Sequence, residues 1–94
     1  MALVDITFLK EGDSYVSVPF AVTGYAVGIH LDFAESAESN FVDLQQSCTG
    51  EGFCTFCLDV VKDQHYDKNI LDVIPGQYIR IKTTLEPTTA KYLE

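Results

Sequence analysis

The chain has 94 residues, a length that accommodates a single domain. Hydrophobic residues make up 47% and aromatic residues 12% of the composition, which supplies a core and excludes the disordered class. Its 14 acidic and 6 basic side chains give a formal net charge of -8, which disfavours nucleic acid and anionic membrane surfaces as partners.

The N-terminal segment MALVDITFLKEGD predicts a strand and not a signal peptide, because it lacks a basic start and a small-residue cleavage site. No stretch approaches the roughly 18 apolar residues that a membrane helix needs. The chain has three cysteines, an odd number that is not typical of a secreted disulfide framework. We therefore expect synthesis in a reducing cytoplasm, without a signal peptide and without a membrane partner.

Alternating apolar residues predict two strands at the start of the chain, separated by the turn EGDS at residues 11–14. Proline cannot donate a hydrogen bond to a strand ladder, so the second strand should end at Pro19 or lie at an edge. The inward residues of these two strands are expected to be Val4, Ile6 and Phe8, then Val16, Val18 and Phe20.

The clearest strand signal is YAVGIHLDFA at residues 25–34. Its inward row is expected to be Tyr25, Val27, Ile29, Leu31 and Phe33. His30 and Asp32 then share the opposite face, where a histidine–carboxylate pair can orient a base for catalysis. No nucleophile motif such as G-x-S-x-G accompanies this pair, so we expect His30 to be an exposed or interface side chain.

A weaker strand is predicted around Val42 and Leu44, after the polar loop ESAESN. The turn CTGEG then leads into the strand FCTFCLDVV, in which Cys54, Phe56, Leu58 and Val60 should face inward and Cys57 outward. KDQHYDKN at residues 62–69 predicts a second polar loop.

Residues 70–86 predict a hairpin, because Pro75-Gly76 suits the central positions of a type II turn. Ile79, Ile81 and Leu85 should face inward, and Pro87 should stop the strand. In total about seven strands are expected, with turn signals every 8 to 12 residues or so, which is typical of a single antiparallel β-sandwich or small barrel. We expect a domain over residues 1–86, followed over 87–94 by a C-terminal arm or short terminal element, whether helix, strand or extended arm.

All three cysteines lie in CTGEGFCTFC at residues 48–57, and with His65 they supply the residue types of a Cys3His zinc site: Cys48, Cys54, Cys57 and His65. A zinc-binding C-x-x-C sits on a tight turn where both sulfurs converge. Cys54 and Cys57 lie three positions apart in a predicted strand, so their side chains should point to opposite faces. We therefore expect the cysteines to act as small hydrophobes, with no metal and no cofactor.

Three other interpretations of these segments stay open. A Cys48–Cys54 disulfide would close the TGEG turn, and a redox C-x-x-C would normally open a helix. Four oxygen-bearing residues that crowd the second polar loop suggest weak cation binding, although the EF-hand pattern is absent and a solvated acidic loop is favoured. These residues are Asp63, Asp67, Asn69 and Asp72.

The sequence contains no cofactor loop and no activated nucleophile, so we predict no enzymatic activity. A structural or assembly protein is favoured, because a small β-domain has open sheet edges that pair readily with another chain. The expected interface residues are Tyr15, Tyr78, Tyr92 and Leu93. The alternative is a small binding module, for instance one for carbohydrate, in which Tyr15, Tyr66 and Tyr78 would lie beside Asp63 or Asp67. The absence of tryptophan makes this alternative less favoured.

An acidic, all-β chain of this length that closes with the segment PGQYIRIKTTLEP resembles the small virion proteins of tailed bacteriophages, such as capsid-decoration, head-fibre and tail-adaptor domains. The resemblance covers the overall character of the chain and its last third. It implies a non-enzymatic, homo-oligomeric component of the capsid or tail. Its partners would be copies of itself and other structural proteins, in contact through sheet edges and the C-terminal arm.

Overall fold

A computed structural model describes residues 2–94, which are organised entirely as strands and connecting loops. The ten strands are β1 (Leu3–Asp5), β2 (Phe8–Glu11), β3 (Ser14–Ser17), β4 (Phe20–Ala21), β5 (Ala26–Phe33), β6 (Phe41–Ser47), β7 (Cys54–Val60), β8 (His65–Leu71), β9 (Tyr78–Thr83) and β10 (Pro87–Leu93). The predicted all-β class is confirmed, with more strands than expected. Within the described range, no helix is long and apolar enough to cross a membrane.

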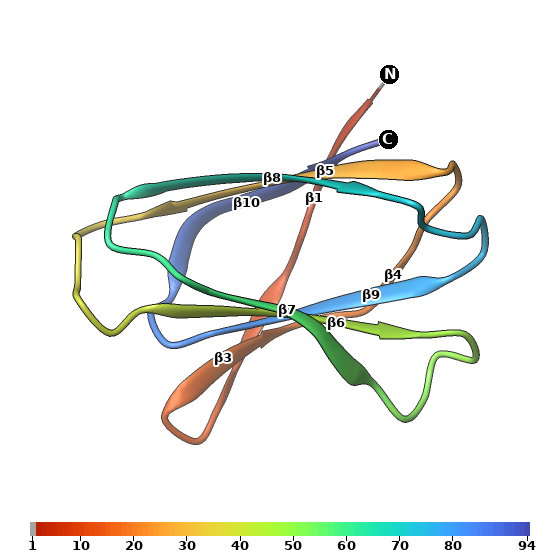
Figure 1. The fold of residues 1–94 in the computed structure, drawn as a ribbon. Coiled ribbons are helices and arrows are strands. Elements are labelled where there is room, and N and C mark those ends of the chain that lie inside the picture. The colour runs from red at the N-terminus through yellow and green to blue at the C-terminus, as the bar shows by residue number, and fades with distance from the viewer. Residues whose placement is uncertain (1) are drawn as a thin grey trace.

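The strands form two antiparallel sheets stacked face to face, as in a β-sandwich (Figure 1). Sheet A has four strands in the order β1-β10-β5-β8. Sheet B has six strands, five of them in the order β2-β3-β9-β6-β7, while β4 pairs separately with β9. Both ends of the described chain lie together at one side of sheet A, where the N–H groups of Ala2 and Glu94 each donate to the other residue's carbonyl oxygen at 3.3 Å.

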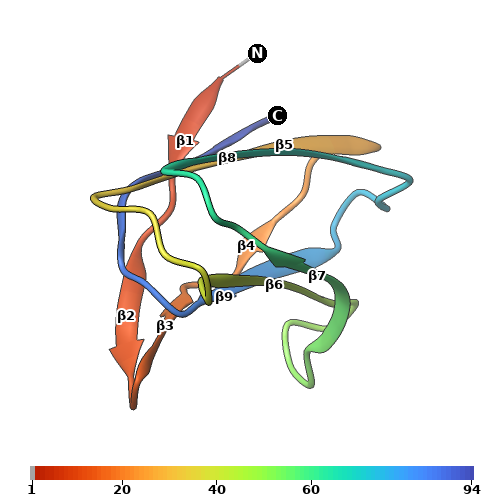
Figure 2. The ribbon, with the colours of Figure 1, turned by 60° about the vertical axis from the view of Figure 1, so that its left-hand side comes forward.

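The first predicted strand is divided between the two sheets, because β1 belongs to sheet A and β2 to sheet B. The chain crosses at Ile6, whose N–H donates to the carbonyl oxygen of Ala90 at 2.8 Å and whose side chain is buried in the core. The second strand stops before Pro19, as predicted, so Val18 lies outside it and is exposed. Figure 2 shows the hairpin of β2 and β3 projecting away from the body of the sandwich.

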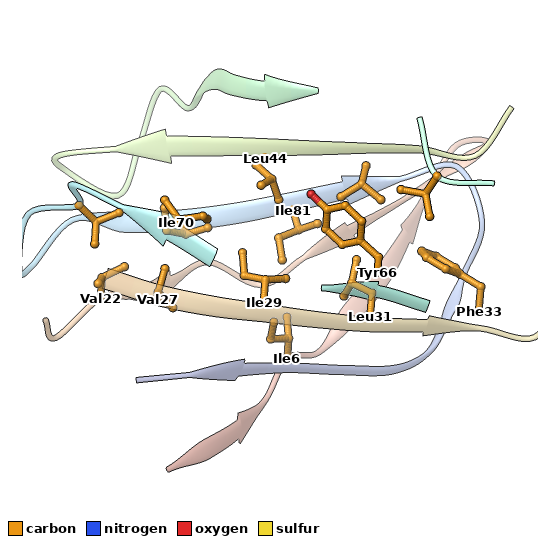
Figure 3. Packing of buried hydrophobic residues seen from close by; sticks show 14 residues of the cluster. Ile6, Val22, Val27, Ile29, Leu31, Phe33, Leu44, Tyr66, Ile70 and Ile81 are labelled. Atoms are coloured by element: carbon orange, nitrogen blue, oxygen red, sulfur yellow. The ribbon is translucent and has the colours of Figure 1, made fainter. Parts of the chain in front are cut away.

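The core lies between the sheets, where the inward row of β5 faces the inward rows of β6 and β9 (Figure 3). The period-two prediction for β5 is confirmed from Val27 to Phe33, but Tyr25 precedes the strand and is 76% exposed. On β9, Ile79 and Ile81 are fully buried, as predicted, and Leu85 packs partly against the cluster. Side chains from strands far apart in sequence therefore meet in one apolar layer.

The predicted polar loop at residues 62–69 is wrong over most of its length, because β8 begins at His65. The inward face of β8 carries Tyr66 and Ile70 with Lys68 between them, while the outward face is polar from His65 to Asn69. A strand with so few inward apolar residues gives a weak sequence signal.

The predicted turn at Pro75-Gly76 is present, since Gly76 has a φ of 92° and the N–H of Gln77 donates to the carbonyl oxygen of Ile74 at 2.9 Å. The turn does not close a hairpin, however. It carries the chain from β8 in sheet A to β9 in sheet B. The predicted hairpin over residues 70–86 is therefore wrong, and the chain changes sheet there.

The expected arm at residues 87–94 is an internal strand. β10 pairs with β1 on one side, with Leu3 opposite Leu93, and with β5 on the other, with Gly28 opposite Leu93. Pro87, expected to end a strand, is the first residue of this one, a position that needs no ladder donor. Of the forms considered for this segment, the structure shows the strand, and the domain extends through it.

We predict that deletion of residues 87–94 abolishes cooperative folding, because it separates β1 from β5 and uncovers both their edges. Urea denaturation followed by near-ultraviolet circular dichroism measures this directly. A truncated chain that still unfolds in a single sharp transition would show that β10 is dispensable.

We predict that Leu31→Ala destabilises the chain by about 2–5 kcal/mol, because Leu31 is fully buried between the sheets. The matched control is Leu71→Ala in the same sheet, where the side chain is 69% exposed and the expected change is below about 0.5 kcal/mol. Urea midpoints of both variants provide the comparison. Equal losses for the two variants would contradict the assigned core.

Candidate functional site

The outer face of sheet A brings together two H-x-D segments, His30-Leu31-Asp32 on β5 and His65-Tyr66-Asp67 on β8. Because β5 and β8 are antiparallel, the histidine of each segment lies opposite the aspartate of the other: His30 faces Asp67, and Asp32 faces His65. In each segment the residue between them, Leu31 or Tyr66, points into the core. The four polar side chains are therefore held on one surface by the burial of their neighbours.

These four side chains form a continuous hydrogen-bonded chain, the histidine–aspartate cluster. His30 Nδ1 lies 2.7 Å from Asp67 Oδ1, and His30 Nε2 lies 3.0 Å from Asp32 Oδ2. The second oxygen of Asp32, Oδ1, lies 2.6 Å from His65 Nδ1. The sequence-based expectation that His30 and Asp32 share a face is confirmed, and the structure adds the two residues from β8.

His30 Nδ1 is hydrogen-bonded to Asp67, and His30 Nε2 lies 3.0 Å from a carboxylate oxygen of Asp32, so both ring nitrogens face an acceptor. Only the protonated imidazolium carries two N–H donors. The hydrogen bond to Asp67 and then that to Asp32 outweigh partial burial and raise the pKa of His30 above its ordinary value. The hydrogen bonds from His65 and then His30 lower the pKa of Asp32.

A second polar contact links the two sheets at the side where β7 and β8 are joined. The hydroxyl of Tyr66 donates to Asp59 Oδ2 at 2.6 Å, and Lys68 Nζ lies 3.7 Å from the same oxygen. The hydrogen bond from Tyr66 is the main cause that lowers the pKa of Asp59, while burial raises the pKa of Tyr66. Tyr66 was expected on a loop, but it lies in the core with its hydroxyl directed to this contact (Figure 3).

The structure does not bring the four residues of the suggested zinc set together. Cys48, Cys54 and Cys57 belong to the β6–β7 hairpin of sheet B, whereas His65 lies on the outer face of sheet A and contacts Asp32. The acidic residues of the expected cation loop are dispersed along β8 and the segments flanking it. Among residues 2–94, no group of three or more histidine, cysteine or acidic side chains is arranged to hold a metal ion.

The cysteine-bearing segment is extended and Phe56 packs against the core, as predicted, but Cys54 and Cys57 do not have the predicted faces. The register of β6 against β7 shifts between Leu44 and Gln45, which leaves Phe56 as an extra residue in a β-bulge. Cys57 therefore lies opposite Leu44 and packs against the core, while Cys54 lies beyond the core and is exposed. All three thiols are free, and Cys48 and Cys54 line one hollow of about 560 Å³ beside the hairpin.

The bulge also places Leu58 and Val60, expected inward, on the outer face of sheet B. With Phe41 of the neighbouring strand they form the β7 apolar strip (Phe41, Leu58 and Val60), whose side chains are 42%, 59% and 52% exposed. The sequence does not predict this strip, because the bulge that creates it contains neither a glycine nor a proline.

The four expected interface residues do not share a surface. Tyr15 and Tyr78 lie half-buried on sheet B, where the ring of Tyr78 covers Gly50 of the β6–β7 hairpin. Tyr92 points inward and stacks on Phe20, with ring centroids 4.1 Å apart and planes inclined by 7°. Leu93 is exposed on sheet A. Of the tyrosines considered for carbohydrate binding, Tyr66 points into the core, on the opposite face of β8 from Asp67, and Tyr15 and Tyr78 lie on sheet B.

Comparison of the chain with protein-family models, curated proteins and solved structures finds no match.

We predict that the stability contributed by His30 is pH-dependent. Its pKa is raised in the folded state from 6.5, so the contribution is complete below about pH 6.5 and is lost as the pH rises through the raised value. The difference in urea midpoint between the wild type and His30→Gln should therefore be largest at mildly acidic pH and shrink towards pH 9 or so.

The matched control is Lys62→Gln, which removes an exposed positive charge outside the histidine–aspartate cluster. Its difference from the wild type should not change with pH. A His30→Gln difference that is equally constant would contradict the doubly hydrogen-bonded imidazolium.

Proposed function

We propose that this chain is a non-enzymatic assembly protein whose copies associate through the edge strand β7. The observation that supports this is the β7 apolar strip at the edge of sheet B, where β7 itself has no outward-pointing charge and the nearest outward carboxylate, Asp43, lies on β6 opposite Leu58. Large apolar side chains grouped at a surface mark contact sites more often than single exposed ones do.

The four strands at the ends of the two sheet orders, β1, β8, β2 and β7, differ in the charged residues that oppose pairing with another strand. β1 carries Asp5, β2 carries Lys10 and Glu11, and β8 carries His65, Asp67 and Lys68. Charged side chains on an edge strand oppose the addition of another strand. The one charged residue of β7 is Asp59, whose carboxylate is already bonded inside the chain to Tyr66 and Lys68. β7 is therefore the least protected edge.

The backbone groups of this edge are also oriented for pairing. The N–H of Val61 donates to the carbonyl oxygen of Asn40 at 2.8 Å, which fixes the phase of the β6–β7 ladder. Hydrogen-bonded and non-hydrogen-bonded pairs alternate along an antiparallel ladder. Leu58 and Val60 therefore direct their N–H and C=O groups away from β6, towards the open side.

The binding partner that best fits the β7 edge is a second copy of the chain. In an antiparallel pairing with Leu58 on the two-fold axis, Asp59 lies opposite the partner's Cys57, so no like charges meet. The strips of the two copies then join into one apolar surface across the boundary. Two-fold dimers are the commonest symmetric assemblies, and such a dimer presents two copies of every other surface for further contacts.

We further propose that this assembly protein is a component of a virion, as the resemblance to small phage proteins implies. There the chain would be a repeated component associated with the capsid or tail, in contact with copies of itself and with other structural proteins. The contacts proposed here use the sheet edge alone, because β10 is committed to the interior of sheet A.

We predict that the wild type forms a dimer with a dissociation constant in about the micromolar range, as expected for a small interface. Each copy carries a net charge of -8, so added salt should strengthen the association by screening repulsion. Leu58→Lys places an ammonium on the two-fold axis and should weaken the dimer about tenfold or more. Sedimentation equilibrium or light scattering over a concentration series measures both effects.

The matched control is Leu9→Lys on β2, the opposite edge of the same sheet, where the leucine is 60% exposed. This variant should associate as the wild type does. A wild type that stays monomeric at high concentration and high salt would overturn the proposal, and so would equal weakening by the two variants.

A further inference from the structure

The outer face of sheet A contains a hollow of about 250 Å³ next to the histidine–aspartate cluster. It is centred on Gly28 of β5, with Leu93 of β10 directly opposite on one side and Asn69 of β8 directly opposite on the other. The hollow is smaller than the one beside the β6–β7 hairpin but more enclosed.

Gly28 leaves part of the floor of the hollow without a side chain. A Cβ atom at this position would lie 3.4 Å from Asn69 Oδ1 and 3.5 Å from Leu93 Cβ, so a side chain here would occupy the space between its two neighbours. Gly28 has no positive φ, which means that the backbone itself does not require glycine. A glycine inside a strand commonly marks a close approach to another group.

The wall of the hollow has an apolar part and a polar part. Leu3 and Leu93, opposite each other on β1 and β10, supply exposed hydrocarbon. Asn69 Oδ1 faces the space above Gly28, and Asp67 and Lys91 complete the polar rim. The rim therefore offers carboxylate and amide acceptors together with amide and ammonium donors.

This combination selects the class of ligand. The net charge of -8 and the carboxylate of Asp67 oppose an anion. The charged groups around the hollow are paired with one another, Lys91 Nζ with Asp5 at 3.7 Å and His30 Nδ1 with Asp67 at 2.7 Å. The lining therefore offers a cation no unpaired carboxylate. Hydroxyl groups both donate and accept, and so satisfy a mixed rim, while the C–H face of a ring packs on leucine.

We infer that this hollow binds a neutral hydroxylated ring of monosaccharide size. The volume equals that of about eight water molecules at roughly 30 Å³ each, which admits one pyranose ring and its substituents. The ring lies over Gly28, with hydroxyls directed to Asp67 and Asn69 and its hydrocarbon face on Leu93. A shallow site with so few polar contacts binds with a dissociation constant in about the millimolar range.

This inference does not depend on the proposed dimer, because β7 and the hollow lie in different sheets. Of the residues that the sequence suggested for carbohydrate binding, only Asp67 takes part, and the apolar contact comes from leucine rather than tyrosine.

The experiment is a titration of the isotope-labelled full chain, followed by amide chemical shifts. The sugar probes are methyl β-D-glucopyranoside, methyl β-D-galactopyranoside and N-acetyl-D-glucosamine, and benzylammonium and benzoate are the charged probes. At least one sugar should produce saturable shifts at the amides of Gly28, Asn69 and Leu93. The charged probes should bind more weakly.

Gly28→Ala places a methyl group on the floor of the hollow, where the ring would lie, and should weaken sugar binding about tenfold or more. Gly24→Ala is the matched control, because its added Cβ meets nothing closer than 3.9 Å, and it should bind as the wild type does. Asn69→Ala, at an exposed side chain, should also weaken binding and replaces Gly28→Ala if that variant fails to fold.

Absence of saturable shifts with all three sugars would overturn the inference. Tighter binding of benzylammonium or benzoate would overturn the assigned ligand class. Unchanged sugar affinity in Gly28→Ala, or in Asn69→Ala if the glycine variant does not fold, would show that the sugar does not bind in the hollow at Gly28.

Discussion

The inward row of β5 determines much of what lies on the surface of this protein. Val27, Ile29, Leu31 and Phe33 are nearly fully buried against the opposite sheet, and a one-residue slip would expose all of them. Because side chains alternate along a strand, their burial obliges Gly28, His30 and Asp32 to face outward. The register of β8 against β5 then fixes which residues oppose them. The histidine–aspartate cluster and the hollow at Gly28 are both consequences of this packing.

The two edges at the β7–β8 side of the sandwich carry opposite kinds of surface. β8 has outward polar residues engaged in the cluster, whereas β7 has the outward apolar strip. Asp59 of β7 links the two strands on their inner side, because its carboxylate accepts a hydrogen bond from the Tyr66 hydroxyl of β8 and lies near the ammonium of Lys68. This inner contact satisfies the charge of Asp59 within the chain and so leaves the outer side of β7 without electrostatic protection.

The sequence predicts the fold class, the core row of β5 and the shared face of His30 and Asp32, because strict alternation over a long strand leaves one arrangement. It does not predict β8, in which Tyr66 and Ile70 are the buried apolar residues and Lys68 interrupts them. The repeated H-x-D pattern was the available signal for the cluster, because two such segments on antiparallel neighbours must face each other reciprocally.

Two further differences between prediction and structure have local causes. The bulge at Phe56 reverses the faces of β7, and neither composition nor periodicity marks its position. The segment TTAKYL has no regular alternation of apolar residues, because β10 buries its residues only partly along most of its length. In both places the outcome depends on contacts with strands distant in sequence, which local patterns do not contain.

The position of β10 has a consequence for how the protein forms. β10 is the last of the ten strands to be synthesised, yet it occupies an internal place in sheet A. A nascent chain on the ribosome therefore cannot assemble that sheet until Pro87–Leu93 has emerged. Until then one edge of β5 is unpaired, and any extended segment nearby can pair with that edge in place of β10. Folding of this sheet should accordingly wait for β10, and it should be slow, because β1 and β10, which pair with each other, are the strands most distant along the chain.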